Sequence, residues 1–186
     1  RMMFKVNYRN NGGTESIVCA QTIANGALGQ VRWYELRRVG GTWTVFQQGN
    51  VGGTDGNSRW MPGISMDGCG NIALMYDVAG TGTPAAHPSI RYTGRNASDP
   101  LGTMTLPESV IFNATVGTGT ITRWGDYNTL VQDYSAVGTP NDGSFWATSQ
   151  HSNQLTRVAN FTLTGGCAPT GPTVTINQAA GQADPT

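Results

Sequence analysis

A motif that recurs about every 60 residues is the feature that most constrains the fold of this chain. The pair Arg59-Trp60 returns as Arg123-Trp124, 64 residues later, and Val31-Arg32-Trp33 is matched by Ile90-Arg91-Tyr92, 59 residues later. Because the two offsets nearly agree, they predict one structural unit repeated along the chain. A four-stranded propeller blade takes roughly 40–50 residues, or more with long loops, so a blade fits this period.

The composition favours strands over helices. The chain has 186 residues, of which 26 are Gly and only 12% are charged, so few stretches can sustain a helix. Apolar residues alternate with polar ones in runs such as 42–46 and 158–163, which is typical of half-buried strands. These patterns predict strands at 4–9, 15–23, 30–38, 42–49, 63–67, 71–78, 89–95, 108–116, 127–133, 144–150 and 156–163.

The predicted strands form an all-β fold of about three four-stranded antiparallel blades, at about 1–50, 59–116 and 123–163. The third blade lacks a fourth strand, and three blades are too few to close a ring. We therefore expect residues 1–167 to be the C-terminal part of a six- to seven-bladed β-propeller, completed by an upstream part of the same polypeptide or by another copy of the chain. Residues 168–172 read as a linker rather than a strand.

Charge and hydropathy exclude two classes of partner. The formal net charge is zero and no basic block is present, so nucleic acid is not expected as a partner. No apolar run reaches the length of a membrane span, so membrane insertion is not expected either. Low charge combined with many Thr, Asn and Gly residues indicates a secreted or cell-surface protein.

Three stretches, residues 59–74, residues 88–102 and Arg123-Trp124-Gly125-Asp126-Tyr127 followed by Phe145-Trp146, resemble bacterial secreted proteins with a sialidase-like propeller of the Asp-box type. The resemblance covers about residues 1–167, and residues 174–186 look like the opening of a bacterial immunoglobulin-like domain. It implies that Cys167 lacks its usual partner, because Ser144 stands where the family often has Cys. A replacement bridge between Cys19 and Cys69 is left open.

The Arg-aromatic pairs are the main candidate binding residues. They precede the first strand of the second and third blades, and Arg1 holds the matching place in the first. Arg1, Arg59 and Arg123 would then form part of a guanidinium ring that suits a carboxylate, sulfate or phosphate ligand. Because a residue repeated in every blade is more often architectural, we favour Arg–Asp pairs that join neighbouring blades, with Asp126 as one partner.

Other polar clusters have a structural interpretation that we prefer. Residues 65–71 resemble an Asp-box turn, in which Asp67 would staple a hairpin rather than bind calcium or glycan. Calcium is possible at the loop 52–57, but a plain turn is favoured, and no other cofactor is expected. His87 and His151 lie in predicted loops without metal-ligand spacing, so both are expected at the surface.

Catalytic residues are not evident. A sialidase-type site needs a Tyr nucleophile beside a Glu, but Tyr34 and Glu35 are neighbours on a strand and point to opposite faces. The leading interpretation is a non-catalytic propeller module of a secreted or cell-surface multidomain protein, serving adhesion, glycan contact or extracellular assembly. The alternatives are a sialidase-like glycoside hydrolase whose catalytic groups lie mostly outside this chain, and a structural subunit of an extracellular filament or layer.

Overall fold

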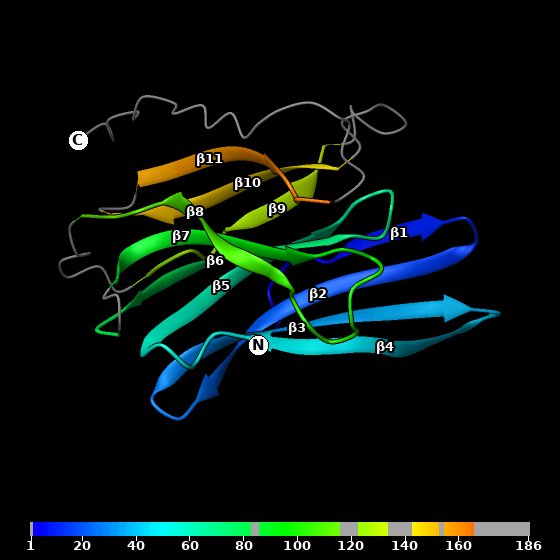
Figure 1. The fold of residues 1–186 in the computed structure, drawn as a ribbon, viewed down its shortest axis with the longest axis horizontal. Coiled ribbons are helices and arrows are strands. Elements are labelled where there is room, and N and C mark those ends of the chain that lie inside the picture. The colour runs from blue at the N-terminus through cyan, green and yellow to red at the C-terminus, as the bar shows by residue number, and fades with distance from the viewer. Residues whose placement is uncertain (1, 83–85, 116–122, 134–142, 153–154, 166–186) are drawn as a thin grey trace.

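The computed structural model describes residues 2–82, 86–115, 123–133, 143–152 and 155–165 (Figure 1). These residues form eleven strands in three antiparallel sheets, and no helix occurs among them. The all-β prediction is therefore confirmed for the described part of the chain. Arg1 and the predicted linker and immunoglobulin-like segment at 168–186 lie outside the described residues.

Each sheet is an up-and-down meander of consecutive strands. The first sheet has the order β1 (Asn7–Asn11), β2 (Thr14–Asn25), β3 (Leu28–Val39) and β4 (Thr42–Val51). The second has the order β5 (Asn57–Met66), β6 (Ile72–Gly80), β7 (Ala86–Arg95) and β8 (Leu106–Phe112). The third has the order β9 (Thr129–Gln132), β10 (Ser144–His151) and β11 (Leu155–Thr162). Among the described residues, β11 pairs with β10 alone.

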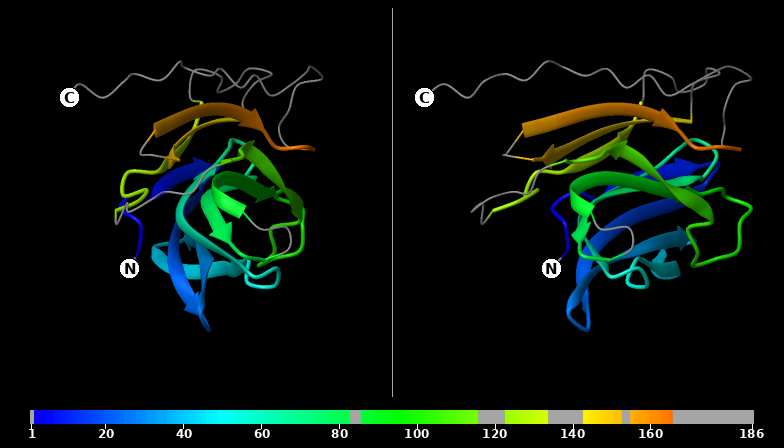
Figure 2. Two further views of the ribbon diagram at one scale, coloured as in Figure 1. Left: turned by 90° about the vertical axis from the view of Figure 1, so that its left-hand side faces the viewer. Right: turned by 60° about the vertical axis from the view of Figure 1, so that its left-hand side comes forward.

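The second sheet lies between the other two, and a separate apolar core fills each interface (Figures 1 and 2). Trp33, which is fully buried, is the largest side chain between the first and second sheets. Between the second and third sheets, Tyr92 stacks on Phe161 with a centroid distance of 4.0 Å. Burial of these aromatic side chains removes much apolar surface from water and holds the sheets together.

The sequence repeat is also a repeat in packing. Val31 and Trp33 on β3 face the second sheet, and Ile90 and Tyr92 on β7 face the third. These are the positions that the 59-residue offset matches. The first and second sheets therefore present equivalent strand residues to the sheet that follows each of them.

The predicted strands match the observed ones in number and order, with ends that differ by a few residues, and the largest difference is at β5, which was expected to begin at Gly63. It begins at Asn57, so the Arg59-Trp60 pair lies inside the strand rather than before it. The ladder with β6 is interrupted between Trp60 and Gly63, where Met61 adopts a φ of 48°. This bulge, next to Pro62, breaks the alternation of apolar residues. The first half of the strand therefore could not be predicted from the sequence.

The cysteines do not form the replacement bridge. Cys69 is disulfide-bonded, whereas Cys19 is a buried free thiol. Burial raises the pKa of the Cys19 thiol, which keeps it protonated and unreactive. Cys167 lies outside the described residues.

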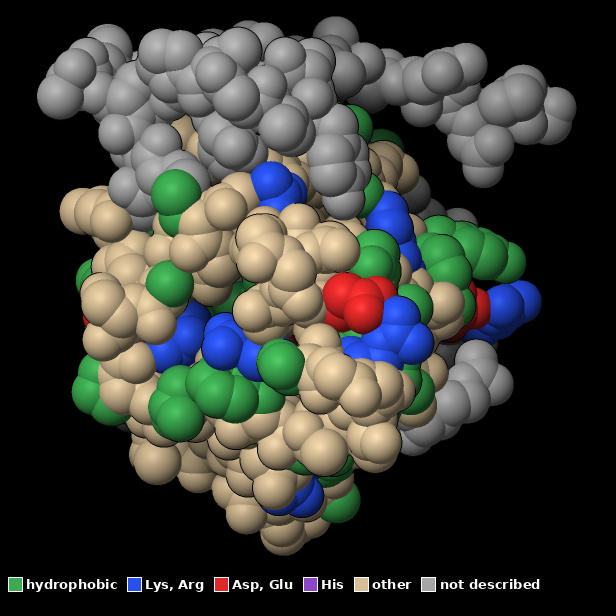
Figure 3. Space-filling model, turned by 90° about the vertical axis from the view of Figure 1, so that its right-hand side faces the viewer, with side chains coloured by type: hydrophobic (Ala, Val, Ile, Leu, Met, Phe, Trp, Pro, Cys, Tyr) green, Lys and Arg blue, Asp and Glu red, His purple; other side chains and the backbone are tan. Residues whose placement is uncertain are grey.

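The end of the molecule that carries the β1–β2 and β3–β4 turns is covered mostly by uncharged atoms, among which several Lys or Arg side chains stand apart and others lie beside Asp or Glu (Figure 3). This face therefore carries no large patch of one charge. In the described part of the chain we find no helix with the length and apolarity needed to cross a bilayer.

Candidate functional site

The Arg59 side chain is buried in a carboxylate cluster beside the second sheet, with 8% of its surface exposed. Its Nη1 and Nη2 donate to the two oxygens of Asp55 at 2.9 and 2.8 Å. Its Nε and Nη2 donate to Glu108 at 2.8 and 3.2 Å. A fifth bond joins Nη1 to the carbonyl oxygen of Asn57 at 3.3 Å. Asp55 comes from the β4–β5 connection and Glu108 from β8, so Arg59 ties three segments together.

All five N–H groups of Arg59 are engaged by these bonds, because a guanidinium has five donors. The hydrogen bonds from Arg59 hold the pKa of Asp55 well below its usual range. A ligand anion would have to displace a carboxylate that is already bound bidentately. The cluster around Arg59 is therefore a closed structural unit rather than an anion-binding site.

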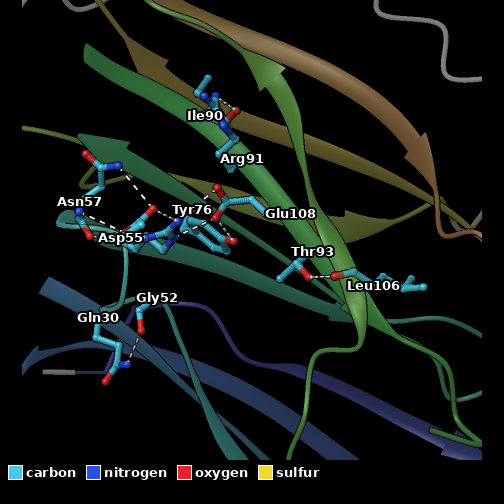
Figure 4. A network of polar contacts seen from close by, with 11 residues as sticks. Gln30, Gly52, Asp55, Asn57, Tyr76, Ile90, Arg91, Thr93, Leu106 and Glu108 are labelled. Carbon is cyan, nitrogen blue, oxygen red and sulfur yellow. Dashed lines mark hydrogen bonds and ion pairs between the residues drawn. The ribbon is translucent and has the colours of Figure 1, made fainter. Parts of the chain in front are cut away.

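A Tyr–Glu pair stands in the same cluster, as Figure 4 shows. Tyr76 on β6 is fully buried, and its hydroxyl donates to Glu108 at 2.7 Å. Sequence neighbours did not indicate this pair, because β6 and β8 are brought together only by the sheet. Burial raises the pKa of Tyr76 well above its usual value, so the phenol stays protonated. A hollow of about 390 Å³ lies beside the pair, between β4, β5 and β8.

Arg123, the second repeated arginine, has a different environment. It precedes β9, 78% of its side chain is exposed, and it donates to Asp126 in the same segment. The Arg123–Asp126 pair therefore joins no two sheets, unlike the bridging pair that we favoured. The local backbone is nevertheless repeated, because Met61 and Gly125, which follow the two Arg-Trp pairs, both have positive φ, at 48° and 64°. The two indole rings also lie against each other, with centroids 6.5 Å apart.

A buried carboxylate between the second and third sheets was not predicted. Asp77 on β6 is fully buried and accepts three hydrogen bonds: from Trp124 Nε1 at 3.0 Å, from Asn128 Nδ2 at 2.7 Å and from Ser149 Oγ at 2.7 Å. Burial raises its pKa to about 7, although these donors act in the opposite direction. The sequence signal was a single acidic residue in the otherwise apolar run of β6. Such a residue needs partners, which identifies it as a candidate.

The Asp67 turn is a hairpin staple, as expected. Asp67 is fully buried, and its Oδ1 accepts the backbone N–H groups of Cys69 and Asn71 at 2.9 Å each. Its Oδ2 accepts Asn71 Nδ2 at 2.8 Å. Gly70 in this turn has a φ of 83°, which a side chain would strain. The carboxylate oxygens thus face the protein and not a ligand.

No group of three or more His, Cys, Asp or Glu side chains with metal-binding geometry occurs among the described residues. In the loop 52–57, which was considered for calcium, Asp55 is bound to Arg59. This contact supports the plain-turn interpretation of the loop.

The two histidines differ in burial. His87 is exposed as expected, but the surface placement of His151 is wrong. His151 ends β10, is 8% exposed and packs against Phe112 of β8, with ring centroids 4.0 Å apart. This contact joins the second and third sheets, and burial lowers the pKa of the ring.

Tyr34 and Glu35 point to opposite faces of the first sheet, as predicted. Gln21 donates to the Tyr34 hydroxyl at 2.9 Å on one face. Glu35 is fully buried on the other face, where Gln47 and Arg37 donate to it at 2.5 Å each. The two side chains cannot act on one substrate.

Comparison of the chain with family models, with curated proteins and with solved structures finds no match. The function is therefore inferred from the geometry of the described residues.

Proposed function

We propose that the chain is a non-catalytic propeller module of a secreted or cell-surface protein, which assembles with further sheets and contacts glycans or other surface molecules. The observation that carries this proposal is an apolar row on the first sheet that the described residues leave partly exposed. Tyr8, Ile17, Leu36 and Val45 are cross-strand neighbours on β1, β2, β3 and β4. Cross-strand neighbours share a face, so these side chains form one apolar row.

This row points away from the second sheet, because Val18, the neighbour of Ile17, packs toward it. Tyr8 and Val45 at the ends of the row are 50% and 56% exposed. On the second sheet the face turned toward its preceding sheet carries Ile72, Leu74 and Tyr76, all fully buried. By the same packing, we expect another sheet to cover the face of the first sheet that carries the apolar row. An exposed apolar sheet face of this kind is typical of an interaction surface.

The occupant that fits is another four-stranded blade, supplied by an upstream part of the same polypeptide or by a second copy. Successive sheets would then continue around a propeller of six or seven blades. The same face would also serve a filament or layer subunit. A closed ring has one finite mass, whereas a filament grows with concentration, so the mass of the assembly separates the two.

Among the described residues nothing adds support for the sialidase-like hydrolase, whose catalytic groups were expected mostly outside this chain. The Tyr76–Glu108 pair is the nearest approach to such a site among the described residues. A nucleophilic Tyr must lose its proton to the neighbouring base, but burial raises the pKa of Tyr76. Arg59 also donates to both oxygens of Glu108, so this carboxylate is already engaged in an ion pair.

Sedimentation velocity of the purified chain over a range of concentrations tests the assembly proposal. We expect concentration-dependent association that is weakened by Val45→Lys, which places a charge in the apolar row. Val39→Lys is the matched control, because Val39 is 75% exposed and lies outside this row. Equal effects of the two lysines on association would show that this face is not the interface. A chain that stays monomeric at every concentration would exclude a second copy as the occupant and leave an upstream part of the same polypeptide.

A further inference from the structure

A second hollow, of about 330 Å³, lies between the segment that precedes β9 and the strands of the third sheet. This volume is at the lower end of the range of roughly 300–1,000 Å³ for small-molecule sites. It is separate from the hollow beside Arg59, since the two share no lining residue. Trp124 and Tyr127 contribute aromatic surface to it, and 80% of Tyr127 is exposed.

Several residues that line the hollow are held in place by hydrogen bonds. Trp124, Asn128 and Ser149 line it, and all three are fixed by hydrogen bonds to the buried Asp77 carboxylate. Gln150 adds two further bonds, because its Oε1 accepts the Gly125 N–H at 3.0 Å and its backbone N–H donates to Asn128 Oδ1 at 3.2 Å. A site whose side chains are held in place loses less entropy on binding.

Polar groups remain for a ligand. The Nε2 of Gln150 is buried, and no described residue accepts a hydrogen bond from it. A buried donor without a partner is costly, so a ligand oxygen in the hollow would be stabilising. Arg123 and Asp126 lie at the exposed side, with 78% and 37% of their side chains accessible. The hydroxyl-bearing Thr148 also lines the hollow.

The charged side chains around the hollow favour a neutral ligand over an anionic one. Arg123 and Asp126 pair with each other, so their charges cancel. An anionic ligand would compete with Asp126 for Arg123, and it would also approach the Asp77 side chain once that buried group has lost its proton. A neutral ligand with several hydroxyl groups avoids both costs, because it donates to Asp126 and accepts from Gln150 and Arg123. Its apolar face would lie on the exposed ring of Tyr127.

We propose that this hollow binds a neutral saccharide, stacked on Tyr127 and hydrogen-bonded to Gln150, Arg123 and Asp126. The proposal assigns a location and a ligand class to the glycan contact of the proposed function. It rests on the proposed function for this contact alone. Its failure is distinguishable from failure of assembly, because binding is measured with sugars and assembly by sedimentation. The guanidinium-ring hypothesis expected an acidic ligand at Arg123, so the two differ in the sign of the ligand's charge.

Saturation-transfer NMR and titration calorimetry with a panel of disaccharides test the proposal. The panel holds maltose, cellobiose, lactose and diacetylchitobiose as neutral sugars, and sialyllactose and a sulfated lactose as acidic ones. We expect at least one neutral sugar to bind at millimolar concentration and more tightly than either acidic sugar. If no neutral sugar binds, or if an acidic sugar binds more tightly, the proposal is wrong.

Exposed tyrosines offer a matched set of variants. Tyr127→Ala should lower the association constant about tenfold, since loss of a stacking contact is worth about 1–1.5 kcal/mol. Tyr127→Phe keeps the ring and should retain affinity within about threefold. Tyr8→Ala, at a residue that is 50% exposed on the first sheet, should change nothing. If Tyr127→Ala binds as the unmodified chain does, the ligand does not occupy this hollow.

Discussion

Replacement of Asp77 by Asn tests the buried carboxylate between the second and third sheets. Asp77 has its pKa raised from 3.8 to about 7 by burial. The folded chain therefore keeps this proton to higher pH than the unfolded chain, which binds fewer protons between about pH 4 and 7. The contribution of the protonated group to the free energy of unfolding is complete below about pH 4 and is lost as the pH rises through about 7.

The difference between the two pKa values corresponds to about 4 kcal/mol. An asparagine side chain at this position has the same shape and no proton to lose. Its carbonyl oxygen can accept from Trp124 and Asn128, while the Ser149 hydroxyl turns to accept from its amide. We therefore expect Asp77→Asn to remove this pH dependence and to be the more stable protein at pH 8.

Urea unfolding followed by tryptophan fluorescence, from pH 4.5 to 8, measures the effect. The lowered pKa of His151 gives a dependence of the opposite sign, because its contribution to stability rises with pH and is complete above its ordinary value of 6.5. This contribution is common to both proteins, so the difference between them isolates Asp77. Asp126→Asn, which removes an exposed carboxylate, is the control. Parallel pH profiles for the chain and for Asp77→Asn would refute the argument.

Four further substitutions test the other structural contacts by the same unfolding measurement. Arg59→Ala leaves Asp55 and Glu108 without their cation and should lower the free energy of unfolding by about 2–3 kcal/mol. Arg123→Ala, at the exposed pair, should lower it by under about 1 kcal/mol. Equal losses for the two variants would contradict the closed cluster around Arg59. Phe161→Ala removes the ring that stacks on Tyr92 and should cost about 3–5 kcal/mol, so a loss near zero would mean that this core is not formed. Asp67→Ala leaves buried N–H groups unpaired and should cost about 1–3 kcal/mol, and a neutral result would argue against the staple.

The strands could be predicted from the sequence because alternation and glycine turns are local signals. Gly12-Gly13 and Gly40-Gly41 mark the tight turns of the first sheet, and all four have positive φ. Where the alternation is broken, the prediction was wrong. The bulge at Met61 hid the first half of β5, and only pairing with β6 defines it.

The candidate site was less predictable because its contacts join residues far apart in the chain. Arg59 and Arg123 share a local motif, yet only Arg59 has Glu108, 49 residues away, to bury it. The Tyr76–Glu108 and Asp77–Ser149 bonds likewise span 32 and 72 residues. His151 was assigned to the surface because nothing near it in sequence indicates Phe112. Local patterns identify such residue types but not their partners.

The central claim is that another sheet covers the first sheet in the assembled protein. An experimental structure of the native, full-length assembly, by crystallography or electron microscopy, tests it most directly. We expect a four-stranded antiparallel sheet packed on the apolar row of Tyr8, Ile17, Leu36 and Val45. A native assembly in which these four side chains face solvent would contradict the propeller and the assembly function together.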